Sequence, residues 1–313
     1  MRNFILRTLL FFAIQVLVCA VLYIAGRGDE SEDRHYLSSL IDKHERLDSM
    51  SRPRLIFVGG SSLMFGINSE HIEKATGRAT VNMGVNAALG LDFILSDIEP
   101  KISSDDLVVL SLEYGFFLKD IAQPPSLWHA LGIAPHNILA MGPSKIPWIM
   151  DNGLYPIRQL ARHPFTGRPE MNDLYSRNNI NERGDIVSRP ERYNIEIKAP
   201  VSAEESNSAR RQAVSRIVLF RERVAKQGAK VIVLYPYLPK SHIKVRGDFY
   251  KSVHLALGEE GFSIVGTPAE ASLKDEYFYD SNYHLTTEGA AIRTKRIVAQ
   301  LKPVIRSMSE QTH

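Results

Sequence analysis

The sequence predicts an α/β fold in which a parallel sheet is covered on both faces by helices. Short apolar runs typical of buried strands alternate with amphipathic helical segments, and the connections between them are short. The runs are nearly continuous in apolar residues and bounded by turn residues, as expected of strands buried on both faces. With 313 residues, the chain is long enough for one sizeable core and an additional lobe.

The first element of the sheet is predicted at a four-residue apolar run, and similar runs recur along the chain. The five predicted strands are Leu55–Val58, Ala79–Met83, Leu107–Leu112, Lys230–Tyr235 and Phe262–Val265. Helical spacing of apolar residues predicts helices between and after them. These are Ser69–Thr76 with Ser69 as N-cap and Gly77 as its end, Leu89–Ile98, a long helix from Ser206 to Gly228, Phe249–Leu257 and Glu288–Ile305.

The composition excludes several function classes. The 38 basic and 35 acidic residues leave a net charge of +3, and no basic run interleaved with aromatic residues appears. A nucleic-acid partner is therefore not expected. The single cysteine, Cys19, excludes a disulfide framework, a CxxC pair and a cysteine-based zinc site. No His and carboxylate cluster has metal-ligand spacing, so we expect neither a metal nor a soluble cofactor.

Residues 1–27 are predicted to anchor the chain in a membrane. Residues 8–25 contain no charge and would span roughly 27 Å as a helix. Arg2 and Arg7 precede this stretch and acidic residues follow it, which favours a cytoplasmic N-terminus and an exported domain. A cleaved signal peptide is the alternative, but no good small-x-small cleavage site ends the stretch. We expect a single-pass protein of the bacterial inner membrane with its C-terminal domain periplasmic or extracellular.

The rest of the chain divides into a stem, residues 28–51, and a domain, residues 52–313. The stem is highly charged with leucines at helical spacing, which predicts a helix that holds the domain away from the membrane. Within the domain, residues 116–205 lack the strand–helix alternation and contain ten of the 16 prolines. A loop-rich insertion of this size is usually a lid or a binding lobe.

Two features of the insertion each have two interpretations. Trp128 and Trp148 are either platforms that stack on sugar rings or part of the insertion's own core. The polar residues Asn181, Arg183 and Asp185 either reach a substrate or form a turn.

Glycines and polar residues follow the predicted strands, at the sheet edge where open α/β sheets bind ligands. Residues 59–62, Gly-Gly-Ser-Ser, form a turn that exposes the Ser61 hydroxyl and its own N–H. Asp280 and His284 share the loop before the last helix. A serine needs a base to become nucleophilic, and the base needs an acceptor for its second ring nitrogen. Ser61, His284 and Asp280 are the candidates for these roles, with Ser62 and Asp275 as alternatives.

In these segments the chain resembles the SGNH (GDSL-like) hydrolase superfamily, specifically its membrane-anchored bacterial branch linked to acylation of cell-surface polysaccharides. Gly59-Gly60-Ser61 corresponds to the first block, in which an Asp usually stands at the position of Gly60. Gly84 corresponds to the second-block glycine, and Asp280 and His284 to the last block. The resemblance implies a flavodoxin-like, three-layer parallel fold with Ser61 as nucleophile, His284 as base and Asp280 as its partner.

The sequence departs from the family pattern at two places. Asp280 and His284 are four positions apart, whereas the family spacing is three. The third block usually offers an Asn to the oxyanion, whereas this chain has Glu113-Tyr114. A carboxylate at Glu113 would repel an oxyanion unless it is protonated or turned aside.

The predicted oxyanion donors are therefore the backbone N–H groups of Ser61 and Gly84, with the Asn86 side chain as a substitute for the missing Asn. Four further residues are expected to line the site, without an assigned chemical role. They are Gly60, Ser62, Glu113 and Tyr114.

The function expected from the resemblance is transfer or hydrolysis of O-acyl groups on a cell-surface or exopolysaccharide through an acyl-Ser61 intermediate. A membrane-bound O-acyltransferase would then be the partner that supplies the acyl group. A deacetylase or lipid esterase with the same serine is the alternative within the enzyme class. A non-catalytic polysaccharide-binding or assembly subunit on the same fold is the alternative from another class, favoured by the altered third block.

Overall fold

The computed structural model describes residues 35–140, 146–155, 173–189 and 207–311, together with part of residues 3–18. Its centre is a five-stranded parallel sheet with the strand order β2-β1-β3-β4-β6. If the five strands of this sheet are numbered 1 to 5 along the chain, their order is 2-1-3-4-5, as in flavodoxin-like folds. The predicted α/β class with a parallel sheet is confirmed.

All five strands form within a residue or two of the predicted apolar runs. They are β1 (Arg54–Gly59), β2 (Ala79–Asn82), β3 (Leu107–Ser111), β4 (Lys230–Leu234) and β6 (Ser263–Val265). The register brings the carboxyl ends of neighbouring strands together, because Phe57 lies opposite Asn82 and Gly59 opposite Ser111. A second, two-stranded sheet of β5 (Leu238–Pro239) and β7 (Ser272–Leu273) was not expected from the sequence.

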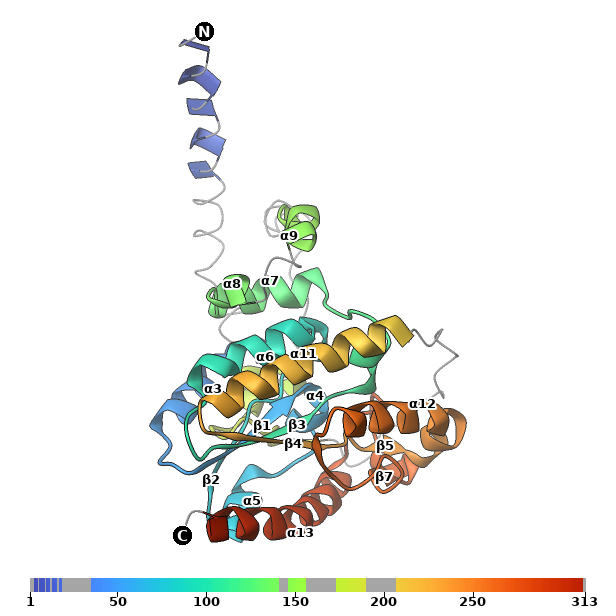
Figure 1. The fold of residues 1–313 in the computed structure, drawn as a ribbon. Coiled ribbons are helices and arrows are strands. Elements are labelled where there is room, and N and C mark those ends of the chain that lie inside the picture. Colours follow the sequence, from blue (N-terminus) through green and yellow to red (C-terminus); the bar gives the residue numbers. More distant parts are fainter. Residues whose placement is uncertain are drawn as a thin grey trace.

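Alternate residues of each strand face opposite layers of the fold. Ile56 and Val58 belong to a core shared with the helices on one face, whereas Leu55 and Phe57 belong to a second core on the other. In Figure 1, α3, α6 and α11 cover the first face, and α5 and α13 cover the second. Because both faces are buried, the strands read as continuous apolar runs instead of alternating ones.

All the predicted helices form; α5 has the predicted bounds, and the others differ from the prediction at one or both ends. They are α5 (Ser69–Thr76), α6 (Leu91–Ile98), α11 (Asn207–Lys226), α12 (Lys240–Glu259) and α13 (Thr287–Gln311). The N-cap of α5 is Asn68, whose side chain accepts from the His71 N–H, and not Ser69 as predicted. Gly77 ends α5 with a positive φ of 69°, a conformation that glycine adopts without strain. Non-helical dihedral angles at Arg246 mark a kink in α12.

The expected stem is packed into the domain and does not stand apart from it. Within residues 28–51 the structure forms α3 (Ser39–Ser49), a helix as predicted, but Leu37, Leu40 and Leu47 are buried in the main core. The fully buried Lys43 donates through Nζ to the carbonyl oxygen of Gly84. This contact ties α3 to the loop that follows β2, so α3 contributes to the region around the carboxyl ends of the strands.

The described parts of the insertion, residues 116–205, form short helices and no strands of the main sheet. They are the end of η4 (Tyr114–Phe117), α7 (Pro124–Ile133), α8 (Asn137–Ala140), α9 (Ile146–Asn152), η6 (Asp173–Tyr175) and η7 (Arg177–Asn179). We call residues 173–189 the return segment, because it runs back onto the domain. The Asn82 N–H donates to the Arg183 carbonyl, and the Ile186 N–H donates to the Met64 carbonyl.

The described residues include no helix with the length and hydropathy of a membrane span. The predicted span, residues 8–25, lies partly outside the described residues.

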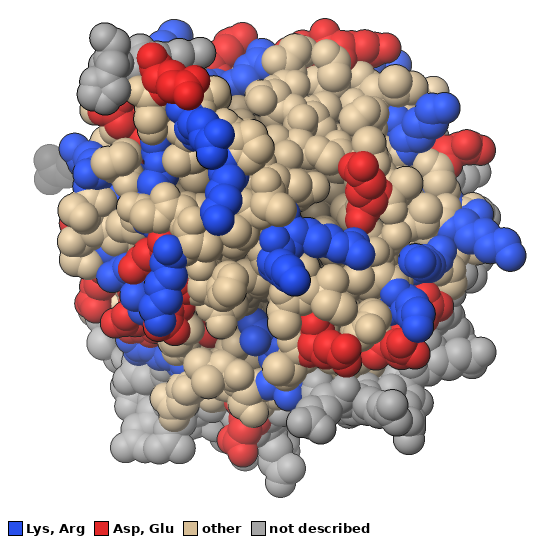
Figure 2. Space-filling model, turned by 90° about the horizontal axis from the view of Figure 1, so that it is seen from below, with Lys and Arg blue, Asp and Glu red and all other residues tan. Residues whose placement is uncertain are grey.

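On the face formed by α5 and α13, Figure 2 shows acidic and basic side chains interspersed among uncharged ones.

Burial of Lys43 predicts a specific pH dependence of stability. Desolvation lowers the pKa of Lys43 to about 7, although Asp185, Asp97 and Asp42 act in the opposite direction. Between about pH 7 and about pH 10.4 the unfolded chain holds a proton that the folded chain has released. The free energy of unfolding of the wild type, relative to that of Lys43→Met, should therefore rise with pH across this window. Urea unfolding at several pH values measures this difference.

The exposed Lys74 on α5 provides the control, because Lys74→Met removes a lysine without a buried ammonium group. Its stability curve against pH should run parallel to that of the wild type. A Lys43→Met curve equally parallel to the wild type would contradict the assignment of a strongly perturbed lysine.

Candidate active site

Ser61 lies on a sharp turn at the carboxyl end of β1. The strand ends at Gly59, Gly60 is extended, and Ser61 begins the single helical turn α4 (Ser61–Met64). A Cβ on Gly59 would lie 2.1 Å from the Ser111 carbonyl oxygen, so only glycine allows this turn to press against the end of β3. This close approach places the Ser61 side chain at the edge of the sheet, where the neighbouring strands also end.

Ser61, His284 and Asp280 form one continuous hydrogen-bonded chain. The Ser61 Oγ lies 2.9 Å from Nε2 of His284, and Nδ1 of His284 lies 2.7 Å from Oδ1 of Asp280. The structure thus brings the three sequence-predicted residues together in the predicted order. Of the two alternatives, Ser62 is buried with its backbone turned to Glu113, and Asp275 accepts from the Ser241 N–H instead.

A tight loop accommodates the four-residue spacing between Asp280 and His284. The Ser281 Oγ accepts from the N–H groups of both Tyr283 and His284, and the Tyr279 N–H donates to the His284 carbonyl. These bonds turn the chain back on itself between the two residues. The additional residue relative to the family pattern is absorbed in this loop, and the carboxylate still reaches the ring.

Tyr175 of the return segment contacts the same carboxylate and was not identified from the sequence. Its hydroxyl donates to Oδ2 of Asp280 and lies 3.3 Å from Nδ1 of His284. The ring of Phe65 stacks on His284 with centroids 4.1 Å apart. Asp280 therefore has one oxygen bonded to the histidine and the other to a tyrosine, which fixes the orientation of both rings.

Hydrogen bonds determine the ionisation of this carboxylate. Burial alone would raise the pKa of Asp280, but the bonds from His284 and Tyr175 outweigh it and lower the pKa below its usual value. Burial and the adjacent Asp280 raise the pKa of Tyr175. Tyr175 therefore stays a neutral donor, and Asp280 stays an ionised acceptor that orients the imidazole.

The structure differs from the prediction at two of the three oxyanion donors. The Gly84 N–H donates to Oδ1 of Asn82 at 2.9 Å, because the Asn82 side chain folds back over the residue two positions later. Asn86 accepts from the Ala88 N–H through Oδ1 and donates through Nδ2 to the Tyr36 hydroxyl. Within the described part of the chain, the Ser61 N–H donates to no acceptor in the protein. This N–H remains the candidate donor to an oxyanion.

Asn82 and Asp185 connect the return segment to this region. Oδ1 of Asp185 accepts from Nδ2 of Asn82 and from the Ser69 hydroxyl, both at 2.8 Å, and Oδ2 accepts from the Ser69 N–H. Oδ1 of Asn181 accepts from the N–H groups of Arg183 and Asp185. The interpretation of these polar residues as a turn is therefore confirmed.

Glu113 lies directly behind the turn that carries the serine. Its Oε1 accepts from the Ser62 N–H at 2.8 Å, and its side chain is buried. Burial raises the pKa of Glu113, while the Ser62 N–H acts in the opposite direction. Gly60 packs on this carboxylate, since a Cβ there would lie 2.1 Å from Oε2. Glu113 thus holds the turn of residues 59–62 in place through its hydrogen bond from the Ser62 N–H.

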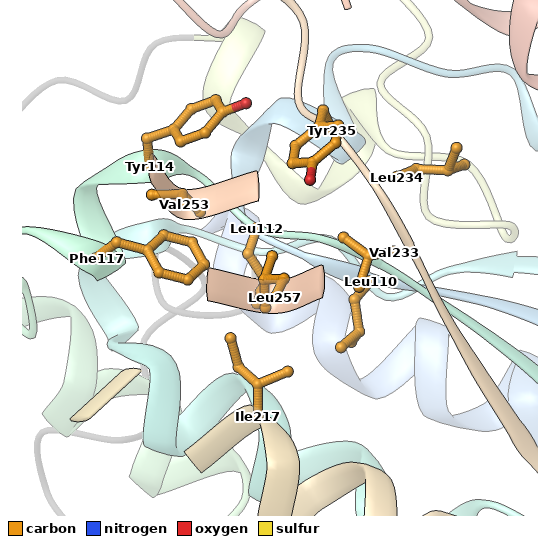
Figure 3. A pocket seen from close by; sticks show the side chains of 10 residues that line it. All are labelled: Leu110, Leu112, Tyr114, Phe117, Ile217, Val233, Leu234, Tyr235, Val253 and Leu257. Atoms are coloured by element: carbon orange, nitrogen blue, oxygen red, sulfur yellow. The ribbon is translucent and has the colours of Figure 1, made fainter. Parts of the chain in front are cut away.

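Tyr114 was expected to line the site, but its side chain faces an apolar pocket in the core. Figure 3 shows this pocket between β3, β4, α11 and α12, with Tyr114 and Tyr235 at one end and aliphatic side chains at the other. The two tyrosine rings are parallel with centroids 6.2 Å apart. Ser61 does not line this pocket, which we therefore assign to core packing. Only the Tyr114 backbone N–H points towards the triad loop, where it donates to the Tyr283 hydroxyl.

Trp128 and Trp148 pack against each other with centroids 5.9 Å apart, and the Trp128 Nε1–H donates to the Asn152 carbonyl. These contacts favour the packing interpretation of the two rings. Within the described part of the chain, no group of three or more His, Cys, Asp or Glu side chains is arranged to hold a metal ion.

The chain has distant structural matches among known proteins. No family model matches the chain, and no curated protein matches its sequence. The structure aligns with a crystal structure of the protein YxiM from Bacillus subtilis at 14% identity and a TM-score of 0.38. The alignment covers 80% of this chain and 56% of the other, so the chain spans little more than half the length of that protein.

The contact between Tyr175 and Asp280 predicts a change in acid stability. Tyr175→Phe removes a donor from Oδ2, so the pKa of Asp280 should rise towards its ordinary value. A carboxylate with a lowered pKa stabilises the fold above about pH 4, and this contribution is lost as the pH falls through the folded-state pKa. The variant should therefore begin to unfold at a higher pH than the wild type, as followed by circular dichroism during acid titration.

Tyr277→Phe is the matched control, because Tyr277 lies close to Asp280 in the chain and packs at the edge of the core. If the two variants have the same acid-unfolding midpoint, Tyr175 does not hold the Asp280 carboxylate in solution.

Proposed function

We propose that this chain is a serine-dependent esterase or acyltransferase of the SGNH type. The observation that carries the proposal is the hydrogen-bonded chain from the Ser61 Oγ through His284 to Asp280, with distances of 2.9 and 2.7 Å. A hydroxyl within reach of an imidazole that is itself oriented by a carboxylate is the arrangement that activates serine nucleophiles.

The proposed reaction proceeds in two steps. Nε2 of His284 takes the Ser61 proton as Oγ attacks the acyl carbonyl, and the same proton then passes to the departing alkoxide. This leaves an ester between Ser61 and the acyl group. In the second step a sugar hydroxyl or a water molecule gives its proton to His284 and attacks the ester carbonyl. His284 then returns this proton to the departing Ser61 Oγ, and the acyl group leaves on the acceptor. In this proposal the Ser61 N–H donates to the carbonyl oxygen that becomes negative in each step.

The proposed substrate is an O-acylated cell-surface or exopolysaccharide, and the proposed location is the bacterial inner membrane. The uncharged stretch of residues 8–25 supports the location, and so does the exposure of Leu10, Phe11, Ile14 and Leu17 in its described part. A membrane-bound O-acyltransferase is the proposed acyl donor if the domain is exported, because acetyl-CoA is absent outside the cytoplasm. These three elements extend the proposal beyond the triad itself.

A non-catalytic polysaccharide-binding subunit is the second candidate. The specific observation in its favour is that the Gly84 N–H is bonded to Asn82, which leaves fewer donors for an oxyanion. Loss of one such donor typically lowers a rate by about 10²- to 10³-fold. The chemical test below separates the two candidates.

The first test of the proposal is the time course of p-nitrophenyl acetate cleavage by the full-length protein in detergent. The wild type should release a burst close to one product per chain, because acyl-Ser61 forms faster than it is resolved. Ser61→Ala should abolish the burst and lower the steady rate by about 10³-fold or more. Ser252→Ala, which removes a hydroxyl on α12, should leave the burst intact. A wild type as inert as Ser61→Ala would favour the binding subunit.

The second test concerns the membrane. The full-length chain should remain in the membrane pellet after alkaline carbonate extraction. Ile14→Arg combined with Leu17→Arg should release it, because each arginine near the centre of a span costs about 2.5–3.5 kcal/mol. Equal extraction of the wild type and the double variant would remove the anchor from the proposal.

A further inference from the structure

The buried carboxylate of Glu113 contacts the serine turn at a position where a helix usually carries its own capping side chain. Gly60 is the N-cap of α4 and has no side chain with which to cap it. At such a position Ser, Thr, Asp or Asn normally accepts a hydrogen bond from the second or third N–H of the helix. The second N–H of α4 belongs to Ser62, and it donates to Oε1 of Glu113 at 2.8 Å.

The carboxylate occupies the space that a side chain at position 60 would need. A Cβ added to Gly60 would lie 2.1 Å from Oε2 and 2.3 Å from Oε1 of Glu113. The backbone of Gly60 has φ −91° and ψ −159°, which is extended and open to any residue. Gly60 is therefore required by the presence of Glu113 and not by its own dihedral angles.

The carbonyl group of the same residue, Ser62, is bound by a buried cation. Arg293 of α13 is fully buried, and it donates to the Ser62 carbonyl oxygen at 2.5 Å and to the Ser111 hydroxyl at 3.0 Å. The residue that follows Ser61 is thus fixed at its N–H by a carboxylate and at its carbonyl by a guanidinium. Neither charge is exposed to solvent, so both bonds lie in an environment where they are strong.

We infer that Glu113 is a positioning residue that caps the serine turn from the end of β3, in place of a capping side chain at position 60. Gly60 and Glu113, which each differ from the residue usual in the family pattern, are then one exchange in which the carboxylate comes from the end of the neighbouring strand β3. The expected effect of Glu113 on reactivity rests on the proposed role of Ser61, whereas the capping of α4 by Glu113 does not.

The thermal stability of four full-length proteins tests the exchange without any use of activity. These proteins are the wild type, Gly60→Asp, Glu113→Ala and the double variant. Gly60→Asp alone should lower Tm by more than about 5 °C, because the new side chain overlaps a buried carboxylate. In the Glu113→Ala background the same substitution should raise Tm, because Asp at position 60 has space and caps the Ser62 N–H. If Gly60→Asp changes Tm by the same amount with Glu113 and with Ala at position 113, the inference is overturned.

Should Gly60→Asp fail to fold, Gly60→Ala makes the same comparison with a smaller side chain. It should lower Tm in the wild type and change it little when Glu113 is replaced by Ala. An equal loss in both backgrounds would again count against the exchange.

The burst rate with p-nitrophenyl acetate tests positioning. Glu113→Ala should slow acylation by about 10- to 100-fold, because the serine is no longer held in line with His284. Glu113→Gln retains an acceptor for the Ser62 N–H and should stay within about fivefold of the wild type. The double variant should recover most of the loss. A Glu113→Gln protein as slow as Glu113→Ala would exclude capping as the role of Glu113.

The two readouts separate this inference from the proposed function. If the wild type shows no burst but the stability effects remain coupled, the proposed chemistry fails and the capping stands. If the burst is present but the stability effects are additive, the chemistry stands and the capping fails.

Discussion

The contact between the turn after β1 and the end of β3 is the constraint on which the rest of the site depends. Gly59 and Gly60 have no Cβ, so the turn approaches the Ser111 carbonyl and the Glu113 carboxylate more closely than any other residues would allow. This approach places the Ser61 hydroxyl where the C-terminal loop can meet it. At Gly59 the obstacle to a larger residue is the backbone of Ser111, whereas at Gly60 it is the Glu113 side chain.

Four ionisable side chains are buried around the site. Lys43, Glu113, Asp185 and Arg293 are all buried, and each makes hydrogen bonds to backbone or side-chain groups of the loops that follow β1, β2 and β3. Buried charges of this kind contribute little net stability, but loss of one partner is costly because the other remains desolvated. They therefore restrict these loops to one arrangement, which is what a preorganised site requires.

The return segment, residues 173–189, joins the insertion to the site through two contacts of different kinds. The Tyr175 hydroxyl donates to Oδ2 of Asp280. The Asp185 carboxylate accepts from the Asn82 side chain and the Ser69 hydroxyl. The insertion therefore contacts the Asp280 carboxylate itself as well as residues at the end of β2 and after β1. Since Asn82 also accepts from the Gly84 N–H, a shift of the return segment would change the donors available near Ser61.

The sequence by itself determined the parallel α/β class, the five strands and the triad residues. Apolar runs bounded by turns identify strands that are buried on both faces, and a serine, an aspartate and a histidine at strand ends converge because parallel strands end at one edge. Only the tertiary structure decided the roles of Tyr175, Lys43, Glu113 and Arg293. Their partners lie between 41 and 231 positions away in the chain, and no local pattern encodes such a contact. The packing of α3 into the core and the internal bond of the Gly84 N–H are likewise consequences of how the layers meet.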